Sequence, residues 1–289
     1  MAKSAKSASS RKPSKSAQSS NVVAEVRRGR GGGKPRRGRA WDNAKSLIGA
    51  RLIFLFIRTF LVEAFKITSG SMIPTLLVGD WLFVNKAVYG PAVPFTHYHL
   101  PGYADPRRGD VVVFVSPYQA DEAARGSDPT PVLVKRLIGM PGDTIYMRRG
   151  VVYIDGVAQR QGFGARGYTG DPAQSTPDET SSLFDWQKTI ALANTRFGSA
   201  PAAPTHDNWG PLLVPAGHYF MMGDNRYCSK DSRYWGVVPR GNIRGRPLFV
   251  YYSYRPGPGG LNDCDGETSD RPLPFITDIR WGRIGHVIR

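Results

Sequence analysis

Residues 67–86, ITSGSMIPTLLVGDWLFVNK, form the stretch on which our interpretation of the whole chain depends. Two serines, Ser69 and Ser71, flank Gly70 directly after the strongly apolar run of the sequence. Gly70 allows a tight backbone turn between them, and Pro74 is incompatible with a helix interior or a continuing strand ladder. The stretch therefore predicts two serines on a fixed bend, although small polar residues here are also typical of a plain helix end.

The positive charge of the chain is concentrated near its start. The 289 residues have a formal charge of +16. Residues 1–45 hold thirteen Lys and Arg side chains against Glu25 and Asp42, a net of +11, which leaves +5 for the other 244 residues. This segment has too few apolar side chains to offset its ordering entropy, so we predict a disordered basic tail over 1–45. It could contact RNA or anionic lipid electrostatically, but specific nucleic-acid binding is not expected.

A long apolar run follows the tail and reads LIGARLIFLFIRTFLVEAFKI from Leu47 to Ile67. As a helix with a rise of about 1.5 Å per residue it would be about 31 Å long, which matches a bilayer core. We therefore predict one transmembrane helix over 46–67, with the basic tail in the cytoplasm and everything after residue 67 outside. Arg58 would cost about 3 kcal/mol within the bilayer. The alternative is an amphipathic helix lying in the membrane plane.

The rest of the chain is dominated by short stretches of β-branched and aromatic residues. Turn signals that contain Gly, Pro, Asp and Asn separate them, which is typical of antiparallel strands. We predict a mainly β, membrane-anchored protein with a barrel-like antiparallel domain over 68–156 and 212–289. The polar segment 157–211, with a short helix around Leu183 to Ala193, is predicted to be an insertion. The predicted strands are Trp81 to Val84, Val111 to Val115, Val132 to Ile138, Thr144 to Met147, Val151 to Ile154, His218 to Met222 and Leu248 to Tyr254.

Lys135 is the candidate base for a serine nucleophile, which needs a neighbouring group to accept its proton. Strand alternation places Lys135 on the face that also presents Leu133 and Leu137. Aliphatic surroundings disfavour the ammonium form and lower the pKa of a lysine from about 10.4. A decrease of about two to three units would leave a useful neutral fraction near pH 8. The alternative is an edge-strand lysine that faces solvent.

Other catalytic chemistries have little support in the sequence. The five histidines have no convincing catalytic surroundings, and a Gly-x-Ser-x-Gly elbow is absent. The chain also lacks His-Glu-x-x-His and Cys-x-x-Cys motifs, so a catalytic zinc is not expected. His97 with His99 is the alternative metal pair.

Four separated blocks resemble one family, the type I signal peptidases of bacteria, which are membrane-anchored proteases with a serine-lysine dyad. With the apolar run they cover most of residues 47–255 outside the polar insertion, in the order found in the family. Each block alone is moderately specific, whereas four in order are highly specific. The blocks are Ser69-Gly70-Ser71-Met72-x-Pro74-Thr75-Leu76-x-x-Gly79-Asp80, Arg108-Gly109-Asp110-Val111-Val112-Val113-Phe114, Lys135-Arg136-x-x-Gly139-x-Pro141-Gly142-Asp143 and Gly223-Asp224-Asn225-Arg226-x-x-Ser229-x-Asp231-Ser232-Arg233-x-Trp235-Gly236-x-Val238-Pro239.

This resemblance implies a role for each matched position. Ser71 would be the nucleophile, and Lys135 the general base that later protonates the leaving amine. The backbone N–H of Ser71 and the hydroxyl of Ser69 would stabilise the oxyanion. Ser229 would hydrogen-bond the lysine nitrogen and orient it, as Asp does in a histidine triad.

The resemblance also implies supporting and substrate-binding residues. Two charged pairs would keep the strands in register, unless they are ordinary surface ion pairs; they are Asp231 with Arg233 and Asp224 with Arg136. Four apolar side chains would line shallow pockets that admit alanine, unless they are ordinary core; they are Ile67, Met72, Leu76 and Val134.

By this resemblance the protein would be a membrane-bound serine endopeptidase that removes N-terminal signal peptides from exported preproteins, after small residues at positions −1 and −3. Its partners would be these preproteins and the phospholipid membrane, and it would need no cofactor or metal. It would cross the bacterial inner (plasma) membrane once, with its catalytic domain on the periplasmic or outer side. Well-known enterobacterial members have two membrane helices, whereas one is predicted here. A Cys228–Cys264 disulfide and two free thiols are both open alternatives.

Two other classes of function compete with this interpretation. A self-cleaving repressor shares the dyad chemistry but needs a DNA-binding module, and nothing in the sequence is typical of a helix-turn-helix. A membrane-tethered binding module without enzymatic activity would depend on residues 1–40 and tolerate alanine at Ser71 and Lys135. The protease predicts the reverse.

Overall fold

The computed structural model describes residues 36–96, 98–160, 181–193, 195–255 and 276–289. The predicted disordered tail therefore lies outside the described residues up to position 35. The chain divides into two compact units, Met1–Ile48 and Gly49–Arg289. All the described strands belong to the second unit, which is the subject of the following paragraphs.

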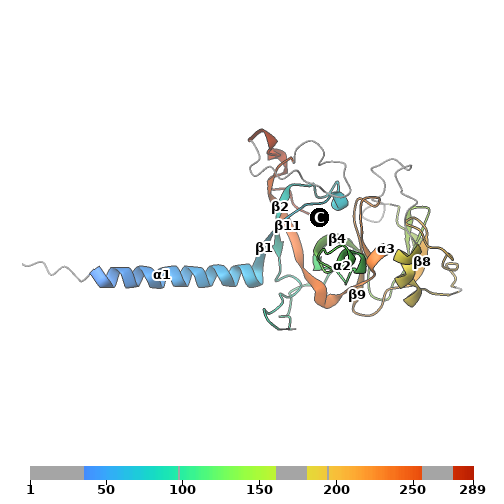
Figure 1. Ribbon diagram of the computed structural model, residues 1–289, viewed down its shortest axis with the longest axis horizontal. Coiled ribbons are helices and arrows are strands. Elements are labelled where there is room, and N and C mark those ends of the chain that lie inside the picture. Colours follow the sequence, from blue (N-terminus) through green and yellow to red (C-terminus); the bar gives the residue numbers. More distant parts are fainter. Residues whose placement is uncertain (1–35, 97, 161–180, 194, 256–275) are drawn as a thin grey trace, which may run out of the picture. The chain divides into compact units, whose positions relative to one another are not determined.

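The described elements are a long first helix followed by short strands, with short helices and helical turns between some of them (Figure 1). The strands are β1 (Val62–Lys66), β2 (Asp80–Asn85), β3 (Val111–Val115), β4 (Val132–Gly139), β5 (Thr144–Arg148), β6 (Val151–Ile154), β7 (Val157–Ala158), β8 (Trp209–Leu213), β9 (His218–Met222), β10 (Val238–Pro239) and β11 (Ile243–Ser253). The helices and helical turns are α1 (Arg36–Phe56), η1 (Ile57–Leu61), η2 (Gly70–Met72), α2 (Ala120–Ala124), η5 (Ser181–Thr189), α3 (Ser232–Trp235), η6 (Arg240–Asn242), η7 (Ile276–Asp278) and η8 (Trp281–Arg283).

The apolar run forms a helix followed by a strand, so the single helix predicted over 46–67 is wrong at both ends. α1 begins at Arg36, η1 continues it as a π-helical turn, and the backbone becomes extended at Val62. β1 then pairs antiparallel with β2, and Phe65 packs against a buried apolar cluster. Pairing and burial thus override the helical pattern in this part of the run. In the described part of the chain, no helix is both long and apolar enough to span a membrane.

A seven-stranded antiparallel sheet forms the larger part of the second unit. Its strand order is β1-β2-β11-β3-β4-β9-β10. β11 is long enough to pair with β3 near its start and with β2 over the rest of its length, and register shifts interrupt both ladders. Such bulges bend and twist a sheet. Since β1 and β10 are edge strands, the predicted barrel-like domain is an open half-barrel, and the prediction of mainly antiparallel β structure is confirmed.

A second antiparallel sheet has the strand order β7-β6-β5-β8. The segment 157–211, which we predicted as an insertion, supplies β7 and the first residues of β8. Trp209 is fully buried and stacks on Phe220 of the large sheet, with ring centroids 5.1 Å apart. The segment therefore contributes to the core as well as to the surface. η5 occupies part of the predicted short helix, and the central part of the segment, 161–180, lies outside the described residues.

Candidate active site

Ser71 and Lys135, 64 positions apart in the sequence, meet at the centre of the candidate site. Ser71 lies in the turn η2, and Lys135 lies in β4. Lys135 Nζ is 2.6 Å from Ser71 Oγ, and the two residues are 3% and 6% exposed. Ser69 Oγ lies 3.3 Å from Ser71 Oγ, so three polar groups converge at one point. This arrangement matches the geometry of a nucleophile and its base.

Lys135 occupies an apolar environment within the large sheet. It stands opposite Val112 in the β3–β4 register, and Val112 belongs to the same buried cluster as Leu137. Burial lowers the pKa of Lys135 to about 8 from the usual 10.5. Nearby charges modify this effect: Asp231 and Asp224 raise the pKa, whereas Arg233 lowers it further. Among the described residues, no carboxylate lies within ion-pair distance of the amine, so a neutral form is accessible near physiological pH.

The nucleophile turn is held against the loop after β9. The backbone N–H of Asn225 donates to Ser71 O at 3.0 Å, and the Asn225 side chain donates to Gly70 O at 3.3 Å. A Cβ atom at Gly223 would lie 2.5 Å from Ser71 O and 2.3 Å from Ser229 Oγ. Only glycine therefore allows the two segments to approach this closely.

Ser229 does not make the hydrogen bond that the family resemblance implied. Its residue is 5% exposed, and its Oγ has no hydrogen-bond partner among the described residues. The hydroxyl lies against Gly223 instead of bonding to Lys135. In this structure, Ser71 is the hydrogen-bond partner of the lysine.

The two charged pairs implied by the resemblance are both formed, and both are buried. Arg136 bonds to Asp224 through two nitrogens, each at 2.6 Å, and also donates to Gly109 O at 2.6 Å. Thr75 donates its hydroxyl to the same carboxylate. The pair is therefore a buried ion pair that connects β4, the loop after β9 and the nucleophile loop, and not a surface ion pair.

The second pair, Asp231 with Arg233, is fully buried. Arg233 Nε and Nη2 each donate to the Asp231 carboxylate at 2.8 Å, and the Gly223 N–H donates to it at 3.0 Å. Burial by itself would raise the pKa of Asp231, but Arg233 and the Gly223 N–H outweigh this effect and lower it. Asp231 therefore remains ionised and fixes the strand end that faces Ser71.

The four predicted pocket residues belong to one apolar cluster beside the dyad. Three of them are at most 7% exposed, and Val134 packs against the cluster from β4. The structure thus brings Ile67, Met72, Leu76 and Val134 together.

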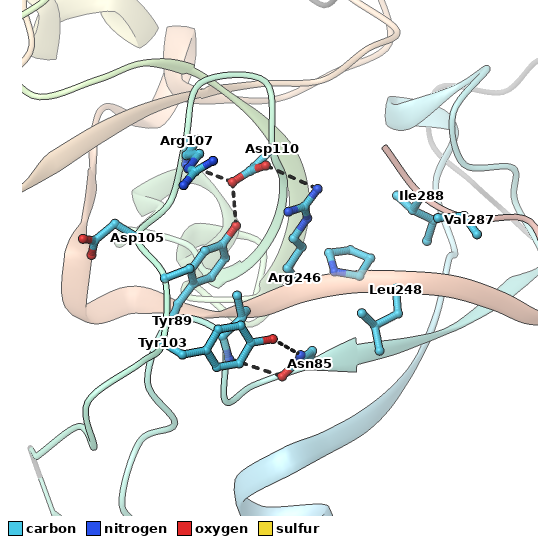
Figure 2. Close-up of a pocket in the computed structure, with 13 residues that line it drawn as sticks. Asn85, Tyr89, Tyr103, Asp105, Arg107, Asp110, Arg246, Leu248, Val287 and Ile288 are labelled. Atoms are coloured by element: carbon cyan, nitrogen blue, oxygen red, sulfur yellow. Dashed lines mark hydrogen bonds and ion pairs between the residues drawn. The ribbon is translucent and has the colours of Figure 1, made fainter.

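A cavity of about 360 Å³ has a lining that includes none of the predicted site residues (Figure 2). The Tyr89 hydroxyl donates to Asp110 at 2.8 Å, and burial together with this contact raises the pKa of Tyr89. Arg246 lies 3.6 Å from the same carboxylate, so the charges partly satisfy one another. Neither Ser71 nor Lys135 lines this cavity, whose residues are Asn85, Val88, Tyr89, Tyr103, Ala104, Asp105, Arg107, Asp110, Arg246, Pro247, Leu248, Val287 and Ile288.

Several further predictions concern metals and thiols. Within the described ranges no group of three or more His, Cys, Asp or Glu side chains could hold a metal ion, and His97 lies outside those ranges. Cys228 is disulfide-bonded, and no described cysteine has a free thiol. Cys264, the partner considered above, lies outside the described residues.

Sequence reasoning missed two groups of residues that support the site. Asp80 is fully buried and accepts from Ser253 Oγ at 2.6 Å and from Arg283 at 2.5 Å. Arg283 also donates to Thr75 O at 3.0 Å, so the C-terminal segment stabilises the nucleophile loop. His206, which had no convincing surroundings in the sequence, bonds to Arg233. The only signal for Asp80 was its place in the first block, and none indicated His206.

Comparisons with known proteins identify the class to which this fold and site belong. The family described as signal peptidase, peptidase S26, matches residues 40–252. Signal peptidase I of Pseudomonas fluorescens and that of Pseudomonas aeruginosa are each 38% identical over 226 residues, covering 74% of this chain and 72% of each relative. Signal peptidase I of Buchnera aphidicola is 33% identical over 278 residues, covering 84% of this chain and 81% of the relative.

The chain belongs to the S26 family of signal peptidases. The predicted family and the predicted class of enzyme, a serine peptidase that cleaves signal peptides from preproteins, are thereby confirmed. The competing predictions of a repressor and of a non-enzymatic binding module are excluded.

Proposed function

We propose that this enzyme hydrolyses preproteins with Ser71 as nucleophile and Lys135 as general base and acid. The neutral amine accepts the Ser71 hydroxyl proton as Oγ attacks the scissile carbonyl. The resulting ammonium then gives that proton to the leaving amine, and water completes hydrolysis of the acyl-enzyme. The observation that carries this proposal is the 2.6 Å separation of Nζ and Oγ at a buried lysine.

The oxyanion is stabilised by the Ser71 N–H and the Ser69 hydroxyl. Ser69 Oγ lies 3.3 Å from the nucleophile, which places a donor beside the developing charge. One such donor is commonly worth about 3 to 4 kcal/mol in serine proteases. Arg136, Asp224, Asp231 and Arg233 hold the surrounding segments, and the electrostatic effects of the last three on Lys135 adjust its pKa.

We propose that the apolar cluster beside the dyad sets the preference for small residues at positions −1 and −3. A shallow pocket with these apolar side chains as walls would admit alanine and exclude larger groups by steric clash. The walls are Ile67, Met72, Leu76 and Val134.

The membrane location is a further part of the proposal. Apolar side chains of α1 from Leu52 to Phe56 are between 46% and 63% exposed, which is typical of a surface that contacts lipid. We place this segment in the bacterial inner membrane as a single anchor, the basic N-terminus in the cytoplasm and the catalytic domain on the periplasmic side. Protease accessibility in oriented membrane vesicles tests this topology: cleavage of the catalytic domain from the cytoplasmic face contradicts it.

Cleavage of a preprotein by the detergent-solubilised full chain tests the mechanism. Because the pKa of Lys135 is about 8, activity should be low at pH 6 and rise with a single deprotonation near pH 8. Ser71→Ala and Lys135→Ala should each abolish cleavage without unfolding the domain, and Ser69→Ala should only reduce it. Normal turnover by either of the first two variants contradicts the proposal.

A further inference from the structure

We infer that His206 is a positioning residue of the active site, because its imidazole holds the Arg233–Asp231 pair that borders the Ser71–Lys135 dyad. His206 acts through these side chains and has no contact with the reacting atoms. The inference rests on the proposed Ser71–Lys135 mechanism and adds a residue that lies outside the four sequence blocks.

His206 reaches the site from the segment that precedes β8. It is 9% exposed, and its ring packs against Tyr227 and Tyr234, with centroids 5.2 and 6.3 Å away. Both tyrosines belong to the stretch between β9 and β10 that also contains Asp231 and Arg233. The imidazole is therefore fixed in position by packing as well as by hydrogen bonds.

In this inference the neutral imidazole of His206 carries its proton on Nδ1. Nδ1 lies 3.0 Å from Asp207 Oδ1, and this contact is the main cause that lowers the pKa of Asp207. Because a carboxylate only accepts, Nδ1 is protonated and the Nε2 lone pair is free to accept from Arg233 Nη1, 2.5 Å away. Arg226 O lies 2.8 Å from Nε2 but only accepts, so with this tautomer the carbonyl takes its hydrogen bond from Arg233 Nη2, 2.7 Å away, and not from the imidazole.

The chain of contacts leads from His206 to the nucleophile. Arg233 is fully buried and bonds to both oxygens of Asp231. Asp231 accepts the Gly223 N–H, and Gly223 lies directly against Ser71 O. Without His206, Nη1 of the fully buried Arg233 guanidinium loses an acceptor. The position of Arg233 beside Asp231 is then less strongly fixed.

Arg233 and Asp231 have opposite electrostatic effects on Lys135. The carboxylate favours the ammonium form, and the guanidinium opposes it. If Arg233 moves away from Asp231, the carboxylate is less neutralised and the ammonium form of Lys135 is favoured. The activity profile should then shift to higher pH, which a purely structural defect would not produce.

The test compares His206→Ala, His206→Gln and His218→Ala in preprotein cleavage from pH 6 to 10. His206→Ala should lower kcat about tenfold and leave KM nearly unchanged. The rise of activity with pH, the rising limb of the pH–activity profile, should move to higher pH. His206→Gln, which can present a carbonyl acceptor to Arg233, should restore most of kcat and the wild-type limb. His218→Ala is the matched control, because the described hydrogen bonds of the His218 side chain reach only the carbonyl of Ala216.

Wild-type kcat and an unshifted pH–activity profile in His206→Ala overturn the inference, as does a folded His206→Gln that is as impaired as His206→Ala.

If His206→Ala does not fold, Asp207→Ala replaces it. The Asp207 side chain is 30% exposed, and its loss frees the tautomer of His206. An unchanged pH profile in folded Asp207→Ala then overturns the inference. Ser71→Ala, assayed alongside, separates the two levels: cleavage by that variant refutes the proposed function, whereas its inactivity beside a normal His206→Ala refutes only the role of His206.

Discussion

Two lysines near the candidate site show how environment decides the chemistry of the same side chain. Lys135 is 3% exposed and its amine contacts the hydroxyl of Ser71. Lys230, whose side chain is 34% exposed, directly follows Ser229 and bonds to Asp121 and Glu122, each at 2.6 Å. The first lysine lacks a bonded counterion among the described residues, whereas the second has two.

The difference explains why only one of them is suited to be a base. A lysine removed from water without a paired carboxylate loses part of its preference for the ammonium form, and the pKa of Lys135 falls to about 8. Lys230 donates to two carboxylates of α2, so it is suited to fixing α2 against the loop after β9.

The largest expected effect comes from replacing each lysine with arginine. Lys135→Arg keeps a cation but removes the group that can deprotonate, so kcat/KM for a preprotein should fall by at least about 1000-fold. Lys230→Arg keeps the cation that its role requires and should change kcat/KM by no more than about threefold. Substantial activity in Lys135→Arg, or an equal loss in both variants, would break the comparison.

The next effect concerns a buried cation that does need its counterion. Asp231→Ala leaves Arg233 fully buried without its paired carboxylate, so the free energy of unfolding should fall by about 3 to 5 kcal/mol. Urea denaturation monitored by circular dichroism measures this difference. A loss of less than about 1 kcal/mol would show that the pair is not a structural requirement.

The burial of Lys135 should also appear in the pH dependence of stability. Its pKa is about 8 in the folded protein and 10.5 in the unfolded chain, so between these values the unfolded chain binds more protons and stability rises with pH. Below pH 8 the full cost of burying the lysine is present. Lys135→Met has no amine to bury, so at pH 7 its free energy of unfolding should exceed that of the wild type. This difference should shrink by about 3 kcal/mol between pH 7 and pH 10.5.

Other titrating groups largely cancel in that difference, because both proteins contain them. Denaturation curves for the pair at several pH values provide the measurement. A difference that stays constant with pH would mean that Lys135 is solvated in the folded protein.

The smallest effect is expected at the partly exposed lysine. Asp121→Ala removes one of the two carboxylates on Lys230, and Glu122 still binds it. The loss in free energy of unfolding should be below about 1 kcal/mol, as for other exposed ion pairs. A loss as large as that of Asp231→Ala would show that this partly exposed ion pair stabilises the fold as strongly as a buried one.

Seven of the eleven described strands could be predicted from local patterns, and the candidate dyad from its sequence blocks. β3, β6 and β9 have the predicted bounds, and β2, β4 and β5 extend the predicted segments by one residue at one or both ends. β1 could not be found in this way, because its residues continue an apolar run and become a strand only by pairing with β2. β11 begins at Ile243, earlier than predicted, since its first residues pair with β3.

The residues that support the active site were likewise predicted only in part. The sequence blocks named Arg136, Asp224, Asp231 and Arg233, and the structure joins them in the expected pairs. The bond from Ser229 to Lys135, however, is not formed, because its hydroxyl lies against Gly223. No sequence pattern indicated His206. It precedes β8, whereas its partner Arg233 follows β9, so the contact between them exists only in the folded structure.

The amino-acid sequence by itself determined the residue types of the site, the order of its four blocks and the strand-forming character of most of the chain. It also concentrated positive charge in residues 1–45, before the apolar run. The tertiary structure alone decided that Lys135 is buried beside Ser71 and has a lowered pKa. The physical reason is that desolvation depends on side chains from several strands distant in sequence, which no local pattern specifies.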